Sequence, residues 1–378
     1  MASPLAGINV LDASGFVSGP LAGTILADLG ATVIKVEPPS GDALLRWGPQ
    51  IQGRSAVYSN CNRGKDVVSL DLKTDDGRLH FLELAQQADV LITNWRTGVV
   101  DRLGLTDALA ERTALVWIRI TGWGSDGPLA DRPAFDGSVQ ARSGIAWCQG
   151  DAEPELIRMF IADKITATIA AQAVTAALFE RTRTGLGTTI DLPMLDSLSY
   201  FNFPDLMQNR TVIADAPIDA RNLQIEANRP VRTADGWIVI SPVGGRQLKA
   251  TLQAIGRSDA VMHMRDAPTA HELTLRLMAL CDAACPQRTT AEWMVVFDGL
   301  DVPIAPVLDL DQHLADPQVV HNRIYGTVRD SFRGDTRRAR YPARFGDDPV
   351  RGATAPARNV DIAAWPTRPA AARSTEGT

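Results

Sequence analysis

The stretch "INVLDASGFVSGPLAGTILADLGATVIKVEPP" (residues 8–39) decides the fold. A β-branched apolar run at 8–14 ends in turn residues. A helical segment follows, with Pro20 suited to its first position and Gly30 to its end. A second apolar run at 31–39 is stopped by two prolines. The pattern predicts a strand, a helix and a second strand, which is the building unit of a parallel sheet.

The same alternation continues beyond this unit. Strands are predicted at 66–72, 89–94, 114–120 and 188–194, and helices at 76–88 and 164–182. Nearly continuous Val, Ile and Leu strands separated by helices indicate a parallel sheet that is covered on both faces. We therefore predict an α/β protein with an open, doubly wound sheet. Its ligand is expected outside the carboxyl ends of the strands.

The pattern changes near residue 200. A less regular stretch leads to "VRTADGWIVISPVGG" (231–245), which predicts a hairpin around Asp235 and Gly236. Helical segments follow to about residue 300, and "GLDVPIAPVLDLDQHLADPQVV" (299–320) carries the chain back. The segment from residue 350 is rich in Ala, Pro and Arg, so a loosely ordered tail is expected there.

Composition narrows the function classes. With 378 residues, 45% hydrophobic and 22% charged, the chain fits a two-domain globular protein. A formal net charge of −6 argues against general nucleic-acid binding. The apolar run 165–179 is shorter than the roughly 20 residues that span a bilayer, so no membrane association is expected. The start "MASPLAGINV" lacks the features of a secretory signal, and four cysteines without a CxxC pair suit a reducing compartment. A cytoplasmic enzyme is expected.

The motifs of common cofactor sites are absent. Gly15, Gly19 and Gly23 are spaced by four, which departs from the G-x-G-x-x-G of dinucleotide-binding turns, and Pro20 removes one backbone N–H there. Glu37 does end the second strand, where a ribose-binding acid would lie. There is no P-loop, no G-x-S-x-G elbow and no metal-ligand cluster among the five histidines. The sequence predicts no permanently bound cofactor and no metal. A carboxylate side chain is therefore the expected reactive group.

A carboxylate stands directly before an uncharged run in "RMFIADKITATIAAQAVTAALFERTRTG" (158–185). Asp163 and Lys164 precede residues 165–179, which carry no charge. A helix N-terminus stabilises an anion by about 0.3–1 kcal/mol. Asp163 is thus interpreted either as an N-cap or as a nucleophile sheltered from water, and one residue can serve both roles. Lys164 is expected to form an ion pair or to pack against the helix.

These stretches occur in order with further fragments: "NRGKDVVSLDLK" (62–73), "ADVLITNWRTGVVDRLGL" (88–105) and "RITGWGSDGP" (119–128). Together they resemble the class III coenzyme A transferases, a group that includes formyl-CoA and carnitine-CoA transferases and the α-methylacyl-CoA racemases. "TADGWIVI" (233–240) and "LADPQV" (314–319) extend the resemblance to about residue 345.

The resemblance implies a Rossmann-like large domain of residues 1–205 plus 320–350. It also implies an inserted smaller α+β domain at 206–319, followed by a C-terminal tail at 351–378. Two subunits are expected to interlock as a homodimer, with active sites between large and small domains.

The resemblance also implies the site residues. Asp163 matches the nucleophile of the transferases, and coenzyme A contacts are implied for Phe16, Val17, Ser18, Leu70, Lys73, Asn94, Trp95 and Arg102. For Lys73, a solvated surface position is an alternative. Asn62 and Arg63 are equally compatible with coenzyme A contacts and with a purely structural role in a turn. Gly244 and Gly245 match the region of a mobile loop, although a turn after a strand is the simpler interpretation.

Within the resembled group, transferase chemistry is favoured over racemisation. A racemase needs two bases flanking the α-carbon. Related racemases carry a histidine immediately before the aspartate at the position of Asp136, and here that residue is Phe135. The predicted function is therefore transfer of CoA between an acyl-CoA and a carboxylic acid, through an aspartyl anhydride and an aspartyl-CoA thioester. An acyl-CoA racemase or isomerase and a non-catalytic acyl-CoA-binding protein stay as alternatives.

Overall fold

The computed structural model describes residues 3–51, 53–150, 153–211, 213, 229–330, 334–346 and 357–358. The chain divides into two compact units. Unit 1 comprises Met1–Phe203 and Asn322–Thr378, and unit 2 comprises Pro204–His321. Among the helices of the described residues, none combines the length and the apolar character needed to cross a membrane.

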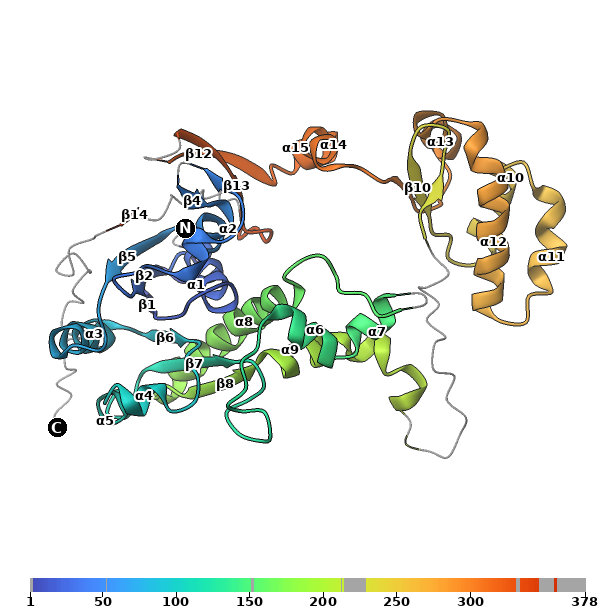
Figure 1. The fold of residues 1–378 in the computed structure, drawn as a ribbon. Helices are drawn as coiled ribbons and strands as arrows, with labels where there is room; N and C mark the ends of the chain where they lie inside the picture. Colours follow the sequence, from blue (N-terminus) through green and yellow to red (C-terminus); the bar gives the residue numbers. More distant parts are fainter. Residues whose placement is uncertain are drawn as a thin grey trace, which may run out of the picture. The chain divides into compact units, whose positions relative to one another are not determined.

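Unit 1 is built on a parallel sheet, as the sequence predicts (Figure 1). In the described part of the chain its order is β14 (Ala357–Arg358), β5 (Lys65–Ser69), β2 (Thr32–Glu37), β1 (Asn9–Asp12), β6 (Val90–Thr93), β7 (Val116–Thr121) and β8 (Thr189–Pro193). The chain starts at β1, runs outward to β2 and β5, and then crosses back to β6. The order therefore reverses between β1 and β6, and the loops after these two strands diverge to leave a crevice.

Helices cover both faces of this sheet (Figure 1). On one face α1 (Ser18–Asp28) packs against α8 (Ile161–Thr184), and on the other lie α3 (Asp75–Gln87) and α5 (Thr106–Ala110). Because successive strand side chains point to opposite faces, Val10 belongs to the α1–α8 core and Leu11 to the α3–α5 core. Both cores consist of buried apolar side chains, which explains the near-continuous apolar strands.

Helix α1 starts two residues earlier than predicted. Its first residue is Ser18, so Pro20 occupies the third position, where a backbone N–H has no partner within the helix and none is lost. Gly30, with φ of +103°, follows its end as expected. At Gly19 an added Cβ would lie 2.2 Å from the Ser14 hydroxyl, so only glycine permits this approach of α1 to the turn after β1.

The remaining described elements of unit 1 surround this framework. They are β3 (Gln50–Ile51), β4 (Arg54–Ser55), α2 (Ala56–Cys61), α4 (Val99–Arg102), α6 (Asp136–Arg142), α7 (Ile145–Gln149), α9 (Met194–Leu206), β12 (Tyr325–Asp330) and β13 (Gly334–Ala339). Within the segment predicted as a tail, residues 357–358 form β14 beside β5. Residues 351–356 and 359–378 lie outside the described residues.

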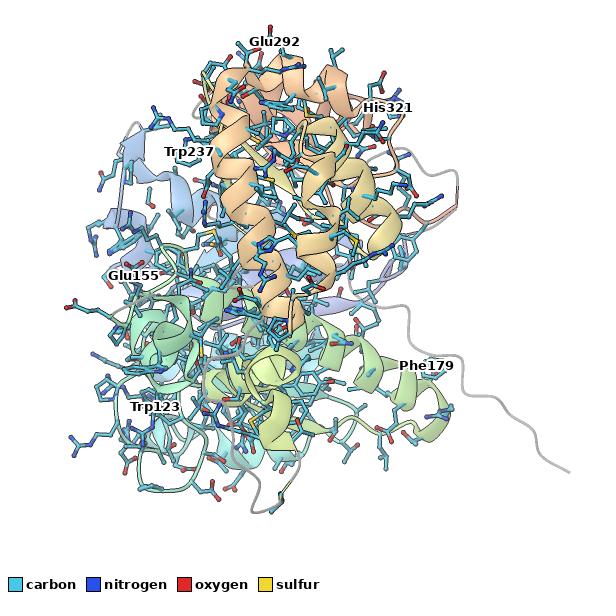
Figure 2. The ribbon with its side chains drawn as sticks, turned by 90° about the vertical axis from the view of Figure 1, so that its right-hand side faces the viewer. Trp123, Glu155, Phe179, Trp237, Glu292 and His321 are labelled. Atoms are coloured by element: carbon cyan, nitrogen blue, oxygen red, sulfur yellow. The ribbon has the colours of Figure 1, made fainter. Side chains whose placement is uncertain are left out.

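Unit 2 combines a small antiparallel sheet with helices. Strands β9 (Val231–Arg232), β10 (Trp237–Ile240) and β11 (Ile304–Pro306) pair in the order β11-β10-β9. The predicted hairpin is confirmed, with Trp237, labelled in Figure 2, opposite Arg232. The helices are α10 (Gly245–Ala254), α11 (Val261–Arg265), α12 (Ala270–Ala284), α13 (Thr290–Phe297), α14 (Leu310–Ala315) and α15 (Pro317–His321). This unit has its own core, which includes the free thiols Cys281 and Cys285.

Candidate active site

Helix α8 places Asp163 in its first turn. The helix begins at Ile161, with Phe160 as its N-cap, so the interpretation of Asp163 as an N-cap is wrong. The backbone N–H of Asp163 donates instead to Oδ1 of Asp136 at 3.1 Å, and α8 is thus capped by a carboxylate from α6. The Asp163 side chain is left available for another role. The uncharged run behind it packs into the α1–α8 core, as the sequence predicts.

The Asp163 carboxylate also faces the N-terminus of α1. It accepts a hydrogen bond from the hydroxyl of Ser18, which is buried at the first position of that helix. Burial raises the pKa of Asp163 to about 6. The Ser18 hydroxyl and backbone N–H oppose this rise in pKa, and the nearby Asp136 adds to it. The carboxylate is therefore mainly ionised at neutral pH while half-buried, which is the state a carboxylate nucleophile requires.

A buried glutamine fixes the approach to Asp163. Gln140 donates from Nε2 to Oδ2 of Asp136 at 2.5 Å and to the carbonyl oxygens of Ile157 and Met159, both at 3.2 Å. Its Oε1 accepts the backbone N–H of Ile157 at 2.9 Å. One side chain thus ties α6 to the segment that leads into α8. Sequence reasoning missed this role of Asp136 and Gln140, because their i, i+4 spacing predicts only that they share one helix face and does not identify their partners.

The turn after β1 forms the opposite wall and carries strain. Phe16 has φ of +62°, which costs a residue with a Cβ about 1–3 kcal/mol. Asn94, directly after β6, fastens this turn: its Oδ1 accepts from Gly15 N–H at 2.9 Å, and its Nδ2 donates to the Gly15 carbonyl at 2.8 Å. The Phe16 ring meets Phe135 edge-on, with centroids 5.2 Å apart. Such strain concentrates at functional sites.

Buried charged side chains stabilise the turn after β1. Lys35 Nζ donates to the Ser14 carbonyl at 2.7 Å and lies 3.1 Å from Asp42. Asp42 in turn accepts from the Phe16 N–H at 3.3 Å. The side chains of Lys35 and Asp42 are almost fully buried. Moving the turn would leave their charges buried without partners, so the geometry of the turn is rigid.

A cavity of about 990 Å³ opens between these walls in unit 1, at the carboxyl ends of β1 and β6. Its wall includes six of the predicted site residues, namely Phe16, Val17, Ser18, Asn94, Trp95 and Asp163. Much of the remainder is apolar, with the rings of Trp47 and Phe160 only 5.2 Å apart. The structure thus brings the expected nucleophile and the β1 turn into one concave, largely apolar site.

Three predicted residues do not line this cavity. Leu70 is buried in the α3–α5 core, and Lys73 and Arg102 are exposed after β5 and after β6. For Asn62 and Arg63 the structure favours the turn interpretation: Asn62 is buried and accepts from Lys65 at 2.9 Å, and Arg63 pairs with Asp28.

Four cations in the cavity wall were not predicted there: Arg96, Arg132, Arg158 and Lys164. Lys164 is exposed and takes part in none of the ion pairs found among the described residues, so the ion pair expected for it is not seen there. In unit 2, Gly244 is the N-cap of α10 with φ of +86°.

The site can be set beside known proteins. The sequence model of CoA-transferase family III matches residues 5–361. An acetyl-CoA:oxalate CoA-transferase of Acetobacter aceti is 33% identical over 324 residues, which cover 83% of this chain and 83% of that protein. A probable fatty acyl-CoA transferase of Mycobacterium tuberculosis is 34% identical over 313 residues, or 78% and 79% of the two chains.

A solved structure shares the fold. The crystal structure of a CAIB/BAIF family protein from Brucella suis superposes with a TM-score of 0.82 at 29% identity. The match covers 95% of this chain and 97% of that one.

Proposed function

The chain belongs to CoA-transferase family III, and from this premise we propose that it moves coenzyme A between an acyl-CoA thioester and a carboxylic acid through Asp163. The observation that carries the proposal is the half-buried Asp163 carboxylate in the wall of a largely apolar cavity. Its Oδ1 accepts the Ser18 hydroxyl, and we assign the attack to Oδ2.

The first half of the proposed reaction loads CoA onto the enzyme. Asp163 Oδ2 attacks the thioester carbonyl, the C–S bond breaks, and a mixed anhydride and the CoA thiolate form. The thiolate then attacks the aspartyl carbonyl of the anhydride. This breaks the bond between the aspartyl carbonyl carbon and the bridging oxygen, releases the first acid as its carboxylate and leaves an aspartyl-CoA thioester.

The second half repeats these steps in reverse. The carboxylate of the second acid attacks the aspartyl thioester, forming a new anhydride and releasing the thiolate. The thiolate attacks the acyl carbonyl of that anhydride and restores ionised Asp163. No net proton is consumed. The apolar wall around Phe160 and Trp47 favours transfer over hydrolysis, because it limits water at the anhydride.

We propose coenzyme A contacts along the carboxyl edge of the sheet. The turn at Phe16, Val17 and Ser18 and the pair Asn94–Trp95 contact the CoA that enters the cavity. Lys73 and Arg102 are exposed after β5 and after β6. The ammonium group of Lys73 and the guanidinium group of Arg102 contact the phosphates of CoA. Of the lining residues in the described chain, none is a histidine, and Phe135 cannot act as a base. This supports transfer over racemisation.

The proposed assembly is an interlocked homodimer in the cytoplasm. Helix α9 exposes Tyr200, Phe201 and Phe203 at 79%, 55% and 49%. On α8, Phe179 is 65% exposed. Figure 2 labels Phe179. Aromatic surface of this extent is typical of a face that another chain covers. Native mass measurement is expected to give twice the chain mass of 40.7 kDa, and a monomer at micromolar concentration would contradict the assembly.

Trapping the intermediate tests the mechanism. The protein is incubated with a panel of acyl-CoA donors and hydroxylamine, digested, and the peptide with Asp163 is analysed by mass spectrometry. An adduct at Asp163 is expected, and Asp163→Ala should abolish both adduct and CoA exchange. Glu83→Ala, which removes an exposed carboxylate of α3, is the matched control and should retain both. Full exchange by Asp163→Ala would reject the proposal.

A further inference from the structure

The Ser18 hydroxyl contacts the reacting carboxyl group itself. It donates to Oδ1 of Asp163, and Ser18 is only 3% exposed at the first position of α1. Its contact with the sulfur of Met194 is longer, at 3.8 Å, and a thioether is a weak acceptor. The hydroxyl proton is therefore directed at Asp163, in a place that water does not reach freely.

The N-terminus of α1 adds to the positive potential around Oδ1. The first N–H groups of a helix have no partner within it, and with the helix dipole they attract negative charge. The backbone N–H and the hydroxyl of Ser18 both favour the ionised form of Asp163. Helices α1 and α8 pack against each other in one core (Figure 1). Oδ1 thus faces hydrogen-bond donors that belong to the fold itself.

The turn before α1 fixes the position of Ser18. Asn94 holds both backbone groups of Gly15, at 2.9 and 2.8 Å. Gly19 approaches the turn so closely that an added Cβ would lie 2.2 Å from the Ser14 hydroxyl. Donors that are fixed in advance need no reorganisation at the moment when charge develops on a reacting oxygen.

Oδ1 becomes a carbonyl oxygen during the proposed reaction, because Oδ2 forms the new bond to the acyl group. When the CoA thiolate attacks Cγ of Asp163, the C=O electron pair moves to Oδ1. As the pair returns, the bond from Cγ to the bridging oxygen breaks and the first acid leaves as its carboxylate. Later the acceptor carboxylate attacks Cγ, Oδ1 takes the pair again, and the Cγ–S bond breaks as the pair returns. Negative charge therefore develops on Oδ1 twice in each turnover.

We propose that Ser18 is a further catalytic residue, whose hydroxyl donates to the oxyanion that forms on Oδ1 when the aspartyl carbonyl carbon is attacked. The hydroxyl keeps its proton throughout, and its hydrogen bond strengthens as the charge on Oδ1 grows. It serves the two steps at the aspartyl carbonyl. It does not serve the two steps at the acyl carbonyls, because those oxygens belong to the substrates. This inference rests on the proposed transferase function.

Step-resolved kinetics of Ser18→Ala test the inference. Rates are measured at pH 8.5, well above the pKa of about 6 for Asp163, so that a change in its ionisation does not contribute. The aspartyl-CoA thioester is formed with excess acyl-CoA, separated from small molecules by gel filtration and mixed with the acceptor acid. Its discharge, followed by rapid quenching and protein mass measurement, should be about 100-fold slower in Ser18→Ala. The appearance of free CoA when fresh enzyme attacks the donor should stay within about threefold.

The controls separate the possible outcomes. Ser18→Cys keeps a weaker donor and should discharge at an intermediate rate, and it decides by the same two rates should Ser18→Ala fail to fold. Ser59→Ala removes a buried hydroxyl of α2 that donates to the Ser55 carbonyl at 3.3 Å, outside the cavity wall, and should match the wild type in both steps.

Two results would overturn the inference while leaving the transferase function standing. One is discharge by Ser18→Ala at the wild-type rate. The other is an equal slowing of donor attack and discharge, which would indicate a general disturbance of the site. A wild-type protein that forms no aspartyl-CoA thioester and transfers CoA to no acid contradicts the proposed function as well.

Discussion

At the scale of single residues, the proposed chemistry depends on a carboxylate, Asp163, whose ionisation is set by opposing interactions. Burial and Asp136 favour the protonated form of Asp163, whereas the Ser18 hydroxyl and backbone N–H favour the ionised form. The resulting pKa of about 6 keeps the group ionised at neutral pH but less stabilised than an exposed aspartate. A less stabilised carboxylate is a more reactive nucleophile.

This balance predicts a pH dependence. Protonation removes the nucleophile, so kcat/KM for the acyl-CoA should fall below about pH 6 and be about tenfold lower at pH 5. Asp136→Asn should move this acid limb to lower pH because it removes the neighbouring negative charge. Ser18→Ala should move it to higher pH because it removes a donor to the ionised form. Rate profiles from pH 4.5 to 8.5 check both shifts, and coincident limbs in all three proteins would contradict the assignment.

The same pKa predicts an effect on stability. The pKa of Asp163 in the folded protein, about 6, lies above the unfolded value of 3.8, so between these values the folded state binds more protons. The contribution of this group to the free energy of unfolding therefore declines as the pH rises from 4 to 6. Asp163→Asn should raise the free energy of unfolding by about 1–3 kcal/mol at pH 7.5 and by almost nothing at pH 4. Urea unfolding at both pH values measures this, and a loss of stability at pH 7.5 would refute it.

Site residues differ in how far the sequence can predict them. Asp163, Phe16, Val17, Ser18, Asn94 and Trp95 follow motifs that the chain keeps intact, and all lie in one cavity wall. The cavity position of Arg158 and Lys164 could not be predicted in this way. It depends on Gln140 and Asp136, which reach the segment before α8 from another helix, and no local pattern encodes that contact.

At the scale of elements, the framework of the site is a set of long-range polar contacts between strands and helices. Lys65 in β5 pairs with Asp12 in β1 at 2.8 Å and donates to the carbonyl of Pro20 in α1 at 2.5 Å. Burial lowers the pKa of Lys65 to about 8, and Asp12 opposes this. These contacts fix the end of β1, from which the turn at Phe16 departs.

Breaking this pair should be costly. Lys65→Met leaves Asp12 as a buried charge without its main partner, and the free energy of unfolding should fall by about 3–5 kcal/mol. Lys73→Met, on an exposed lysine after the same strand, should stay within about 0.5 kcal/mol. Chemical denaturation measures both. The double variant Asp12→Asn/Lys65→Met should lose less than the two single losses combined, and strict additivity would contradict the pairing.

Elements were predictable where local pattern dominates. Strands such as β1 and β2 appear as β-branched runs, and Asp235–Gly236 marks the hairpin of β9 and β10. The start of α8 was predicted too late, because Phe160 is not a typical capping residue and the capping carboxylate comes from Asp136. Helix ends that depend on tertiary partners carry no such local signal.

At the scale of the whole molecule, the chain forms two folding units. The proposed nucleophile, the β1 turn and the cavity all belong to unit 1, which is assembled from both ends of the chain. Unit 2 is one continuous segment, Pro204–His321. Every buried residue of its core cluster lies between Val231 and Val302, so this core is formed within unit 2 itself.

This continuity predicts that the fragment 229–321 folds alone. Its three-stranded sheet and helices α10–α13 enclose a complete core, and a domain of this size is commonly stable by about 5 kcal/mol or more. The fragment should unfold cooperatively in urea, with near-ultraviolet circular dichroism from the buried Trp293 as the signal of fixed packing. Phe297→Ala should cost about 3–5 kcal/mol because Phe297 is buried, whereas Val295→Ala, 75% exposed on the same helix, should change little. A gradual transition, or equal effects of the two variants, would show that the core of unit 2 needs the rest of the chain to form.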